Sequence, residues 1–472
     1  MLRPWQLSLQ LNYDCGKPIY LQIADAIIAD IQSGRLKQGT ALPGSRKLSE
    51  QLKLNRNTIV DALQVLLNEE WLVAKERKGT FVADQLPLLS VYQKVPVAID
   101  DNAAALLPPR IHFDDGYPDS KIAPIAELAR AYRQIFNRKA RWQLMGYGSE
   151  LGDWKFRQEL SRMLNHKRSL QVAAQQVCVT RGSQMAMYLA AQCLLKKDDW
   201  VIVENPGYQP AWKAFDQAGA RLLPVNVDEE GLMTDDIKRI LQSGRKIKAV
   251  YATPHHQYPT TVTMSLQRRL ELVQLANKYG FTIIEDDYDN EFHFGYRPVL
   301  PISSFDELKK YVYIGTMSKV VAPALRIGYL ATTIPGLIEK IAALRKIIDV
   351  QGDAIMEQAV LQLIHDGTIK KHLKKATQYY RSKRDLTEAL LVKYMGEKAG
   401  YTVPEGGLAF WIVPFKKCNW NHIAAQLQKK GIKIITPNLY SFGKAVSGIR
   451  LSYGALSAEQ LEEGVRELAL LI

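Results

Sequence analysis

The sequence has no run of about 18 apolar residues, and its first residues do not form a secretory signal. We therefore expect no membrane span and a cytoplasmic location. Only four cysteines occur, and none lies in a CxxC pair or a zinc-binding spacing, so we interpret them as reduced thiols. The sequence also shows no repeat and no low-complexity tract, which excludes a solenoid.

Acidic residues are fewer than basic ones, 48 against 62, and the net charge is +14. This excess permits a polyanionic partner such as nucleic acid. Hydrophobic residues make up 47% of the chain and charged residues 23%, which is typical of globular proteins and excludes a fibrous or disordered chain. Because 472 residues exceed one ordinary hydrophobic core, we expect at least two domains.

The first part of the chain has the pattern of three short helices and a hairpin. Isoleucine recurs at every fourth position from Ile19 to Ile31, which predicts a helix with one apolar face. A second helix is expected near Ser45, whose hydroxyl we predict as its cap, and a third is expected after Asn55. Two β-prone runs then surround a turn at Gly79. This order predicts a winged helix-turn-helix domain.

Basic residues are concentrated within this part. Residues 31–60 contain six basic residues and one acidic residue, whereas residues 1–84 as a whole contain 11 basic and nine acidic residues. The start of the third helix is the end that enters the DNA major groove in helix-turn-helix proteins, and the wing reaches an adjacent groove. We expect contacts with operator DNA there; the alternative is a winged helix that serves protein contacts alone. The predicted DNA-contacting residues are Arg56, Asn57, Thr58, Lys78 and Gly79.

The rest of the chain follows a different pattern. Residues 85–110 contain prolines without a sustained period, which is typical of a linker. Beyond residue 110, β-prone runs alternate with helical segments, as in a parallel α/β sheet. We predict a DNA-binding domain at 1–84, a linker at 85–110 and a large α/β domain at 111–472.

Lys319 is the strongest chemical signal in the large domain. It follows a β-prone run together with Thr316 and Ser318, at a strand end where ligands bind in open α/β sheets, and Arg326 comes seven residues later. An amine can form a Schiff base with an aldehyde, and hydroxyl and guanidinium groups can hold a phosphate. These residues suit pyridoxal 5'-phosphate (PLP), an aldehyde that carries a phosphate.

Further strand ends agree with this cofactor. Asp286, 33 residues upstream of Lys319, suits the pyridine nitrogen of PLP, and Tyr288 suits its phenolic oxygen. Tyr208 follows another strand and can stack on the ring. The amides at a predicted helix start can stabilise the phosphate; they belong to Gly182, Ser183 and Gln184. The alternative for the acidic run 285–289 is a magnesium site.

Several motifs carry a resemblance to known families. Residues 16–84, from KPIYLQIADAI to KGTFVA, resemble the DNA-binding domain of the GntR superfamily of bacterial regulators. The motifs VCVTRGSQ, ENPGY, FTIIEDDYD, GTMSK and GIRLSYG resemble fold-type I aminotransferases. The order of the two parts resembles the MocR subfamily of GntR regulators. This resemblance implies a winged helix fused to a large PLP-dependent aminotransferase-like domain, in a head-to-tail homodimer.

The resemblance also implies roles for single residues. Lys319 corresponds to the lysine of the internal aldimine, and Arg46 to a basic residue that contacts the operator. Arg450 corresponds to the arginine that holds a substrate carboxylate. Tyr258 stands where asparagine is usual, and Pro210 stands where some amine-sensing members have a charged residue.

Arg450 also stands out by itself, because a charged side chain in the apolar run GIRLSYG has to face a cleft or pair with an internal acid. A planar guanidinium suits a carboxylate. We expect a transcription regulator whose large domain senses a small amine, an amino acid or PLP itself. The alternative is an active aminotransferase with an accessory DNA-binding domain, but an enzyme gains nothing from a DNA-reading head.

Overall fold

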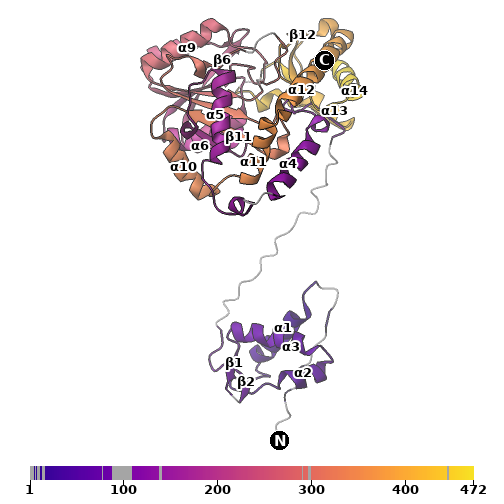
Figure 1. Cartoon of the computed structure of the whole chain (residues 1–472). Coiled ribbons are helices and arrows are strands. Elements are labelled where there is room, and N and C mark those ends of the chain that lie inside the picture. The colour runs from indigo at the N-terminus through magenta and orange to yellow at the C-terminus, as the bar shows by residue number, and fades with distance from the viewer. Residues whose placement is uncertain are drawn as a thin grey trace. The chain divides into compact units, whose positions relative to one another are not determined.

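The chain divides into two compact units, Met1–Leu106 and Leu107–Ile472, which are described separately (Figure 1). The boundaries expected from the sequence stay a prediction, because most of the predicted linker lies outside the described residues. The computed structural model describes residues 5, 7, 11–12, 16–76, 78–87, 109–137, 141–289, 291–295, 299–443 and 446–472.

The first unit has the winged helix-turn-helix architecture. Its helices pack around one apolar cluster that includes Ile23, Ile27, Leu48, Ile59 and Leu66. The antiparallel wing pairs Leu72 with Val82 and Lys75 with Gly79. The elements are α1 (Ile19–Gln32), α2 (Ser45–Leu52), α3 (Arg56–Asn68), β1 (Leu72–Lys75) and β2 (Gly79–Val82).

One of the two predicted helix caps in this unit is wrong. Asn55 caps α3, because its side-chain oxygen accepts a hydrogen bond from the amide of Asn57 at 2.9 Å. Ser45, in contrast, is the first residue of α2 and Gly44 precedes the helix. The Ser45 hydroxyl instead accepts a hydrogen bond from Nε of Arg56 at 3.4 Å, which links α2 to the start of α3.

An eight-stranded sheet forms the centre of the large unit, in the order β4-β11-β10-β9-β8-β5-β6-β7. The five strands from β10 to β6 are parallel, whereas β11 is antiparallel to both β10 and β4. The strands are β4 (Val177–Thr180), β5 (Trp200–Asn205), β6 (Arg221–Asp228), β7 (Gly231–Leu232), β8 (Ile247–Ala252), β9 (Thr282–Asp287), β10 (Tyr311–Thr316) and β11 (Gly328–Thr332).

Helices cover both faces of this sheet (Figure 1). Neighbouring residues of a strand enter different apolar clusters: Ile202 belongs to one, and Val201 and Val203 belong to the other. Burial on both faces explains why these strands read as continuous apolar runs. The helices of these layers are α4 (Ile125–Asn137), α5 (Trp154–Arg168), α6 (Ser183–Leu194), α7 (Gln209–Gln217), α8 (Thr234–Gln242), α9 (Leu266–Tyr279), α10 (Leu337–Ile348) and α11 (Ala354–His365).

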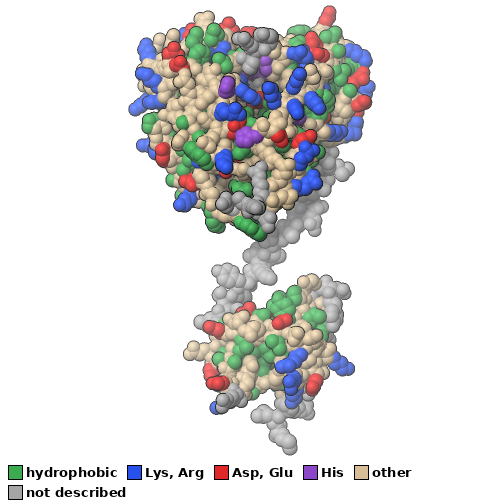
Figure 2. Space-filling view, viewed as in Figure 1, with side chains coloured by type: hydrophobic (Ala, Val, Ile, Leu, Met, Phe, Trp, Pro, Cys, Tyr) green, Lys and Arg blue, Asp and Glu red, His purple; other side chains and the backbone are tan. Residues whose placement is uncertain are grey.

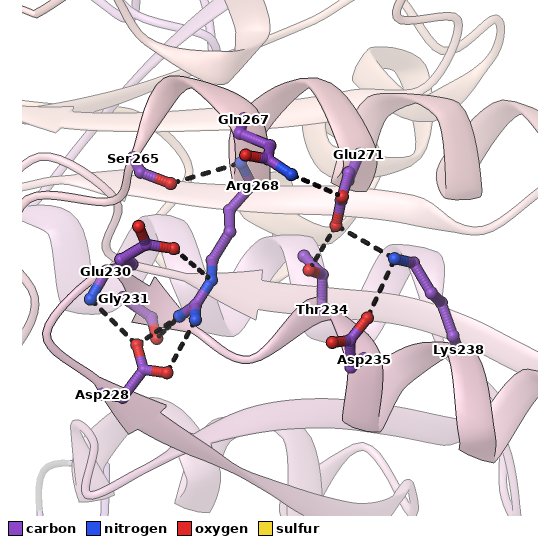
Figure 3. A network of polar contacts seen from close by, with 10 residues as sticks. All are labelled: Asp228, Glu230, Gly231, Thr234, Asp235, Lys238, Ser265, Gln267, Arg268 and Glu271. Atoms are coloured by element: carbon purple, nitrogen blue, oxygen red, sulfur yellow. Dashed lines mark hydrogen bonds and ion pairs between the residues drawn. The ribbon is translucent and has the colours of Figure 1, made fainter.

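A polar network joins α9 to the hairpin of β6 and β7 (Figure 3). Arg268 contacts the carboxylate of Asp228 through both Nη atoms and donates to the carbonyl of Gly231 at 2.7 Å. Glu271, one turn later, accepts from the hydroxyl of Thr234 at 2.6 Å. The network fixes the helix that leads directly into β9, the strand that carries Asp286.

A smaller lobe completes the large unit. Its antiparallel sheet has the order β12-β13-β15 and encloses a third apolar cluster with three helices. The elements are β3 (Ile111–His112), α12 (Thr368–Tyr394), β12 (Ala399–Tyr401), β13 (Ala409–Pro414), α13 (Trp420–Lys429), β14 (Ile432–Lys433), β15 (Ile449–Ser452) and α14 (Ala458–Ala469). Short 3₁₀ turns span Ser120–Ile122, Arg141–Met145, Ala174–Gln176, Ile302–Ser304, Pro323–Leu325, Gly396–Lys398 and Pro437–Leu439.

Candidate cofactor pocket and DNA-binding surface

A pocket lies at the carboxyl ends of β8, β9 and β10, beside the amino terminus of α6. Residues from widely separated segments line it, and nine of the ten residues predicted for the cofactor are among them. The lining consists of Asp115, Tyr117, Pro118, Ser183, Gln184, Tyr208, Thr253, Tyr258, Asp286, Tyr288, Thr316, Ser318, Lys319, Pro323 and Arg326. The tenth predicted residue, Gly182, directly precedes this lining.

Lys319 follows β10, and its Nζ lies 4.5 Å from the centre of the Tyr288 ring. Burial lowers the pKa of this amine, although the carboxylate of Asp289 opposes the shift. A lowered pKa increases the fraction of the neutral amine, which is the form that attacks an aldehyde. The Thr316 hydroxyl fixes the turn before Lys319 by accepting from the amide of Ser318 at 3.0 Å.

Asp286 lies within β9 and is buried. One of its oxygens accepts a hydrogen bond from the hydroxyl of Tyr251 at 2.9 Å, while Oδ1 has no partner among the described residues. Burial raises the pKa of this carboxyl to about 7, and the Tyr251 hydrogen bond partly offsets the shift. Because buried polar atoms are nearly always paired, the Oδ1 atom suits a donor on a bound ligand.

The amino terminus of α6 and Arg326 form the other end of the pocket. Gly182 has a φ of +80°, and a Cβ at this position would lie 2.6 Å from Nη2 of Arg326. A larger residue would therefore displace the guanidinium. Arg326 also donates to the carbonyl of Arg181 at 3.3 Å, which holds it beside the first amides of α6. Guanidinium and helix amides together suit a phosphate.

Arg450 comes from β15 in the smaller lobe and is only 1% exposed. It donates to the carbonyl of Pro259 at 3.1 Å and to the hydroxyl of Tyr288 at 3.4 Å, and its Nε has no hydrogen-bond partner among the described residues. The guanidinium also stands 5.2 Å from the centre of the Tyr258 ring. Arg450 therefore contacts Tyr288, whose ring also lies next to the amine of Lys319.

Two tyrosines define one wall of the pocket. Tyr208, at the start of α7, meets the ring of Tyr258 edge to face at a centroid distance of 5.1 Å. Tyr258 also donates from its hydroxyl to the carboxylate of Asp115 at 2.5 Å. Sequence reasoning noted Tyr258 only as a replacement for asparagine, and it gave no role to Asp115 or to Tyr251.

The predicted DNA-contacting residues lie on α2, at the start of α3 and on the wing. Arg46, Arg56, Asn57, Lys78 and Gly79 are exposed, and Thr58 is half-buried. Figure 2 shows Lys and Arg side chains gathered over α2. The fold brings the helix part of the set together through the contact of Arg56 with Ser45.

The comparisons with known proteins distinguish the two parts of the chain. Residues 19–82 match the model for bacterial regulatory proteins of the gntR family. The chain is 27% identical to aromatic-amino-acid aminotransferase 1 of Thermococcus litoralis, over 76% of this chain and 87% of that protein. The kynurenine aminotransferase structure of Pyrococcus horikoshii has a TM-score of 0.72 and 27% identity, over 76% of this chain and 90% of that one.

The similarity to one regulator extends over nearly the whole chain. The probable rhizopine catabolism regulatory protein MocR of Rhizobium meliloti is 26% identical over 98% of this chain and 95% of that protein. The chain is thus similar to MocR-type regulators over nearly its whole length. It is a DNA-binding transcription regulator whose large unit has the fold of the fold-type I aminotransferases, as the sequence motifs predicted.

The acidic side chains of the run 285–289 contact separate partners. Glu285 accepts from the amides of Ile302 and Ser303, both at 2.8 Å, and Asp289 contacts Nδ1 of His256 at 2.8 Å. Among the described residues, no group of three or more histidine, cysteine or acidic side chains is placed to hold a metal ion. Nor does any described helix have the length and apolar character that a membrane span requires.

His256 and Gln257 precede Tyr258 in the chain and lie outside the pocket lining. Gln257 donates to the carbonyls of Pro206 at 2.8 Å and Tyr258 at 2.6 Å. Both side chains are buried and neither is part of the pocket lining. They shape the turn that presents Tyr258.

Proposed function

We propose that this MocR-type regulator binds PLP at Lys319 and that a small amine with a carboxylate, entering the same pocket, alters its binding to operator DNA. The observation that supports this best is the Oδ1 atom of Asp286, which has no partner among the described residues and belongs to a pocket that Lys319 and Arg326 also line. These three groups match the three polar ends of PLP. Its relative from Pyrococcus horikoshii was solved with PMP, the amine form of this cofactor.

Each residue has a distinct task in this proposal. Lys319 would hold the cofactor covalently, Asp286 would accept from its ring nitrogen, and Tyr288 would contact its phenolic oxygen. When bound, PLP supplies an electrophilic carbon that amines attack. The phosphate end would be held by Gly182, Ser183, Gln184, Thr316, Ser318 and Arg326, with the Tyr208 ring against the pyridine.

Arg450 would bind the carboxylate of the effector. It is buried beside Tyr288, and its Nε has no described partner, so a bidentate anion can satisfy it. An effector that reacts with the cofactor would thus bridge the large sheet, which carries Lys319, and the smaller lobe, which carries Arg450. Such a bridge favours one relative placement of the two lobes, and this is how binding energy can alter DNA affinity.

We also propose a head-to-tail homodimer in the cytoplasm, where the operator is reached by two winged helices. Exposed apolar side chains from two segments support a partner surface on the large unit. Tyr147 is 90% exposed and Ile347 83% exposed, and a hydrogen bond from the amide of Gly148 to Gln351 joins their segments. We name this surface the apolar patch; it comprises Trp142, Met145, Tyr147, Ile347 and Val350.

The test uses the full chain and three measurements: visible absorption with PLP, operator binding, and the response of both to added amino acids. Lys319→Ala should lose the covalent absorption band and keep weak operator binding. Arg450→Ala should keep the band and operator binding while losing the response to amino acids. A Lys319→Ala spectrum equal to that of the parent would refute the covalent site.

The same assay separates the other interpretations. If only PLP itself modulates operator binding by the parent, the protein is a coenzyme sensor. Steady conversion of amino acid and 2-oxo acid, with no effect on operator binding, would favour the aminotransferase alternative, which Lys319 and Asp286 in one pocket, with Arg450 beside Tyr288, keep open.

A further inference from the structure

Asp115 is an acidic residue of the pocket without a role in the function proposed above. It lies between β3 and the first 3₁₀ turn of the large unit. Its neighbour Asp114 accepts from the amides of Gly116 and Tyr117, both at 2.8 Å, and so fixes the turn. Asp115 itself is half-buried and lines the pocket, where its Oδ1 accepts from the hydroxyl of Tyr258 at 2.5 Å.

Asp115 differs from the other charged residues of the described pocket lining. Four charged side chains belong to the described lining: Asp115, Asp286, Lys319 and Arg326. The last three match the ring nitrogen, the aldehyde and the phosphate of the cofactor. Asp115 matches no part of PLP, and a carboxylate repels the phosphate and the effector carboxylate alike. A carboxylate in this position is suited to a cation on the effector.

We propose that Asp115 selects effectors with a second cationic group, which makes a basic amino acid the preferred ligand class. This inference rests on the proposed function, in which the amine of the effector would replace the released amine of Lys319 on the cofactor and the carboxylate of the effector would bind Arg450. The side chain of the effector then extends past Tyr258, and its ammonium group pairs with Asp115.

The surroundings of Asp115 agree with this role. Tyr258 donates to one oxygen of the carboxylate, and no other side chain among the described residues donates to it, so the second oxygen can accept from a ligand. Asp115 also acts electrostatically on the reacting groups, because it favours the charged forms of Lys319 and Arg450. The carboxylate therefore acts within the space in which an effector would bind.

A purely structural role is the competing explanation, in which Asp115 only orients Tyr258. The variant Tyr258→Phe removes that hydrogen bond and leaves the negative charge in the pocket. Asp115→Asn removes the charge and leaves an oxygen that accepts from Tyr258. If the charge selects the effector, Asp115→Asn loses the ligand preference and Tyr258→Phe keeps it. If the hydrogen bond matters instead, Tyr258→Phe loses the preference and Asp115→Asn keeps it.

The experiment titrates the PLP-loaded full chain with L-ornithine, L-norleucine and L-glutamate and follows both the cofactor spectrum and operator binding. Ornithine and norleucine have side chains of similar length and differ by the ammonium group. We expect the parent to bind ornithine about threefold to fivefold more tightly than norleucine, and glutamate most weakly, because a partly exposed ion pair contributes a difference of this size. Asp115→Asn should bind ornithine and norleucine equally, whereas Tyr258→Phe should keep the ratio.

Glu397→Gln, which removes an exposed acidic group outside the pocket lining, is the matched control and should keep the ratio of the parent. Equal affinities of the parent for ornithine and norleucine, or a preference that survives in Asp115→Asn, would overturn the assignment of Asp115 while a norleucine response still supported the amino-acid effector. Absence of any response to all three amino acids would overturn both.

Discussion

Among the described residues, the carboxylate of Asp286 has a hydrogen-bond partner on only one of its two oxygens. Tyr251 lies on the preceding parallel strand, β8, and donates to one oxygen, so the other oxygen is left for a ligand. Because burial raises the pKa of the carboxyl to about 7, a cationic ring nitrogen would stabilise the ionised form that burial disfavours.

We predict that Asp286→Asn weakens PLP binding by about tenfold or more, since the amide loses the charge-assisted hydrogen bond to the ring nitrogen. Tyr251→Phe should have a smaller effect, because it removes a support of the carboxylate and not the carboxylate itself. Titration of the cofactor-free full chain with PLP, followed by absorption, measures both. Equal affinity of Asp286→Asn and the parent would contradict the assigned partner of the nitrogen.

Glu357 permits a prediction on stability. It is 2% exposed, accepts from the amide of Asp153 at 2.5 Å, and burial raises its pKa from 4.5 to about 7. Between these pH values the folded state holds a proton that the unfolded state has lost, so this group destabilises the fold as pH rises.

Glu357→Gln does not titrate at this position. Its free energy of unfolding relative to the parent should therefore increase between pH 4 and pH 8, by up to about 3 kcal/mol. Urea unfolding of both proteins over this range measures the difference. A difference that is constant with pH, or that decreases, would show that the carboxyl keeps an ordinary pKa.

Residues of the pocket differ in how well the sequence predicts them. Lys319, Asp286 and Tyr208 lie at or just after the ends of strands. Because the carboxyl ends of parallel strands meet at one edge of the sheet, their positions along the chain were sufficient to predict that they share a site. Asp115 and Tyr258 are 143 residues apart and meet only in the folded chain. No local pattern marks such a pair, so the sequence did not predict a role for Asp115.

At the scale of elements, the start of α3 combines two tasks. Asn55 satisfies the amide of Asn57 and so fixes the first turn, and Arg56 contacts Ser45 of α2. The cap was predictable because asparagine before an apolar periodic run is a helix start signal. The start of α2 was not predictable in this way, because the Ser45 hydroxyl accepts a hydrogen bond from Arg56, eleven positions later in the chain.

We predict that Arg56→Ala weakens operator binding by about 1–3 kcal/mol if the side chain contacts a base. If it contacts a phosphate, the slope of the logarithm of the binding constant against the logarithm of the salt concentration should decrease in magnitude by about one. Arg46→Ala should act in the same direction. Lys17→Ala serves as the control, because Lys17 precedes α1 and pairs with Asp25. Operator binding at several salt concentrations distinguishes the cases; unchanged binding by both arginine variants would show that DNA meets another surface.

The strand β11 shows the limit of reading a sheet from sequence. Its apolar composition resembles that of its parallel neighbours, yet it is antiparallel to β10 and β4. Only the short loop from β10 requires this direction, because parallel neighbours need a longer crossover. That loop carries Lys319 and Arg326, so the same hairpin brings the amine and the guanidinium to one pocket.

For the whole molecule, the apolar patch leads to a prediction on assembly. Ile347→Glu places a charge in the proposed dimer surface, which is costly when the surface is buried. We expect sedimentation to shift from a dimer toward the 53.3 kDa monomer, with weaker operator binding because two linked winged helices bind more tightly than one. Val392→Glu, at an apolar residue 63% exposed on α12, should leave the assembly unchanged. A dimer that persists in Ile347→Glu would place the interface elsewhere.

The apolar clusters have a consequence for protein engineering. Within the described residues, the cluster of the first unit draws on positions 5–86, and the clusters of the large unit draw on positions 111–472. Each unit thus buries its apolar surface with its own side chains. A chimera that exchanges residues 1–87 for the winged helix of another regulator leaves every cluster of the large unit complete, so one ligand pocket can be coupled to a reporter promoter of choice and used as a biosensor.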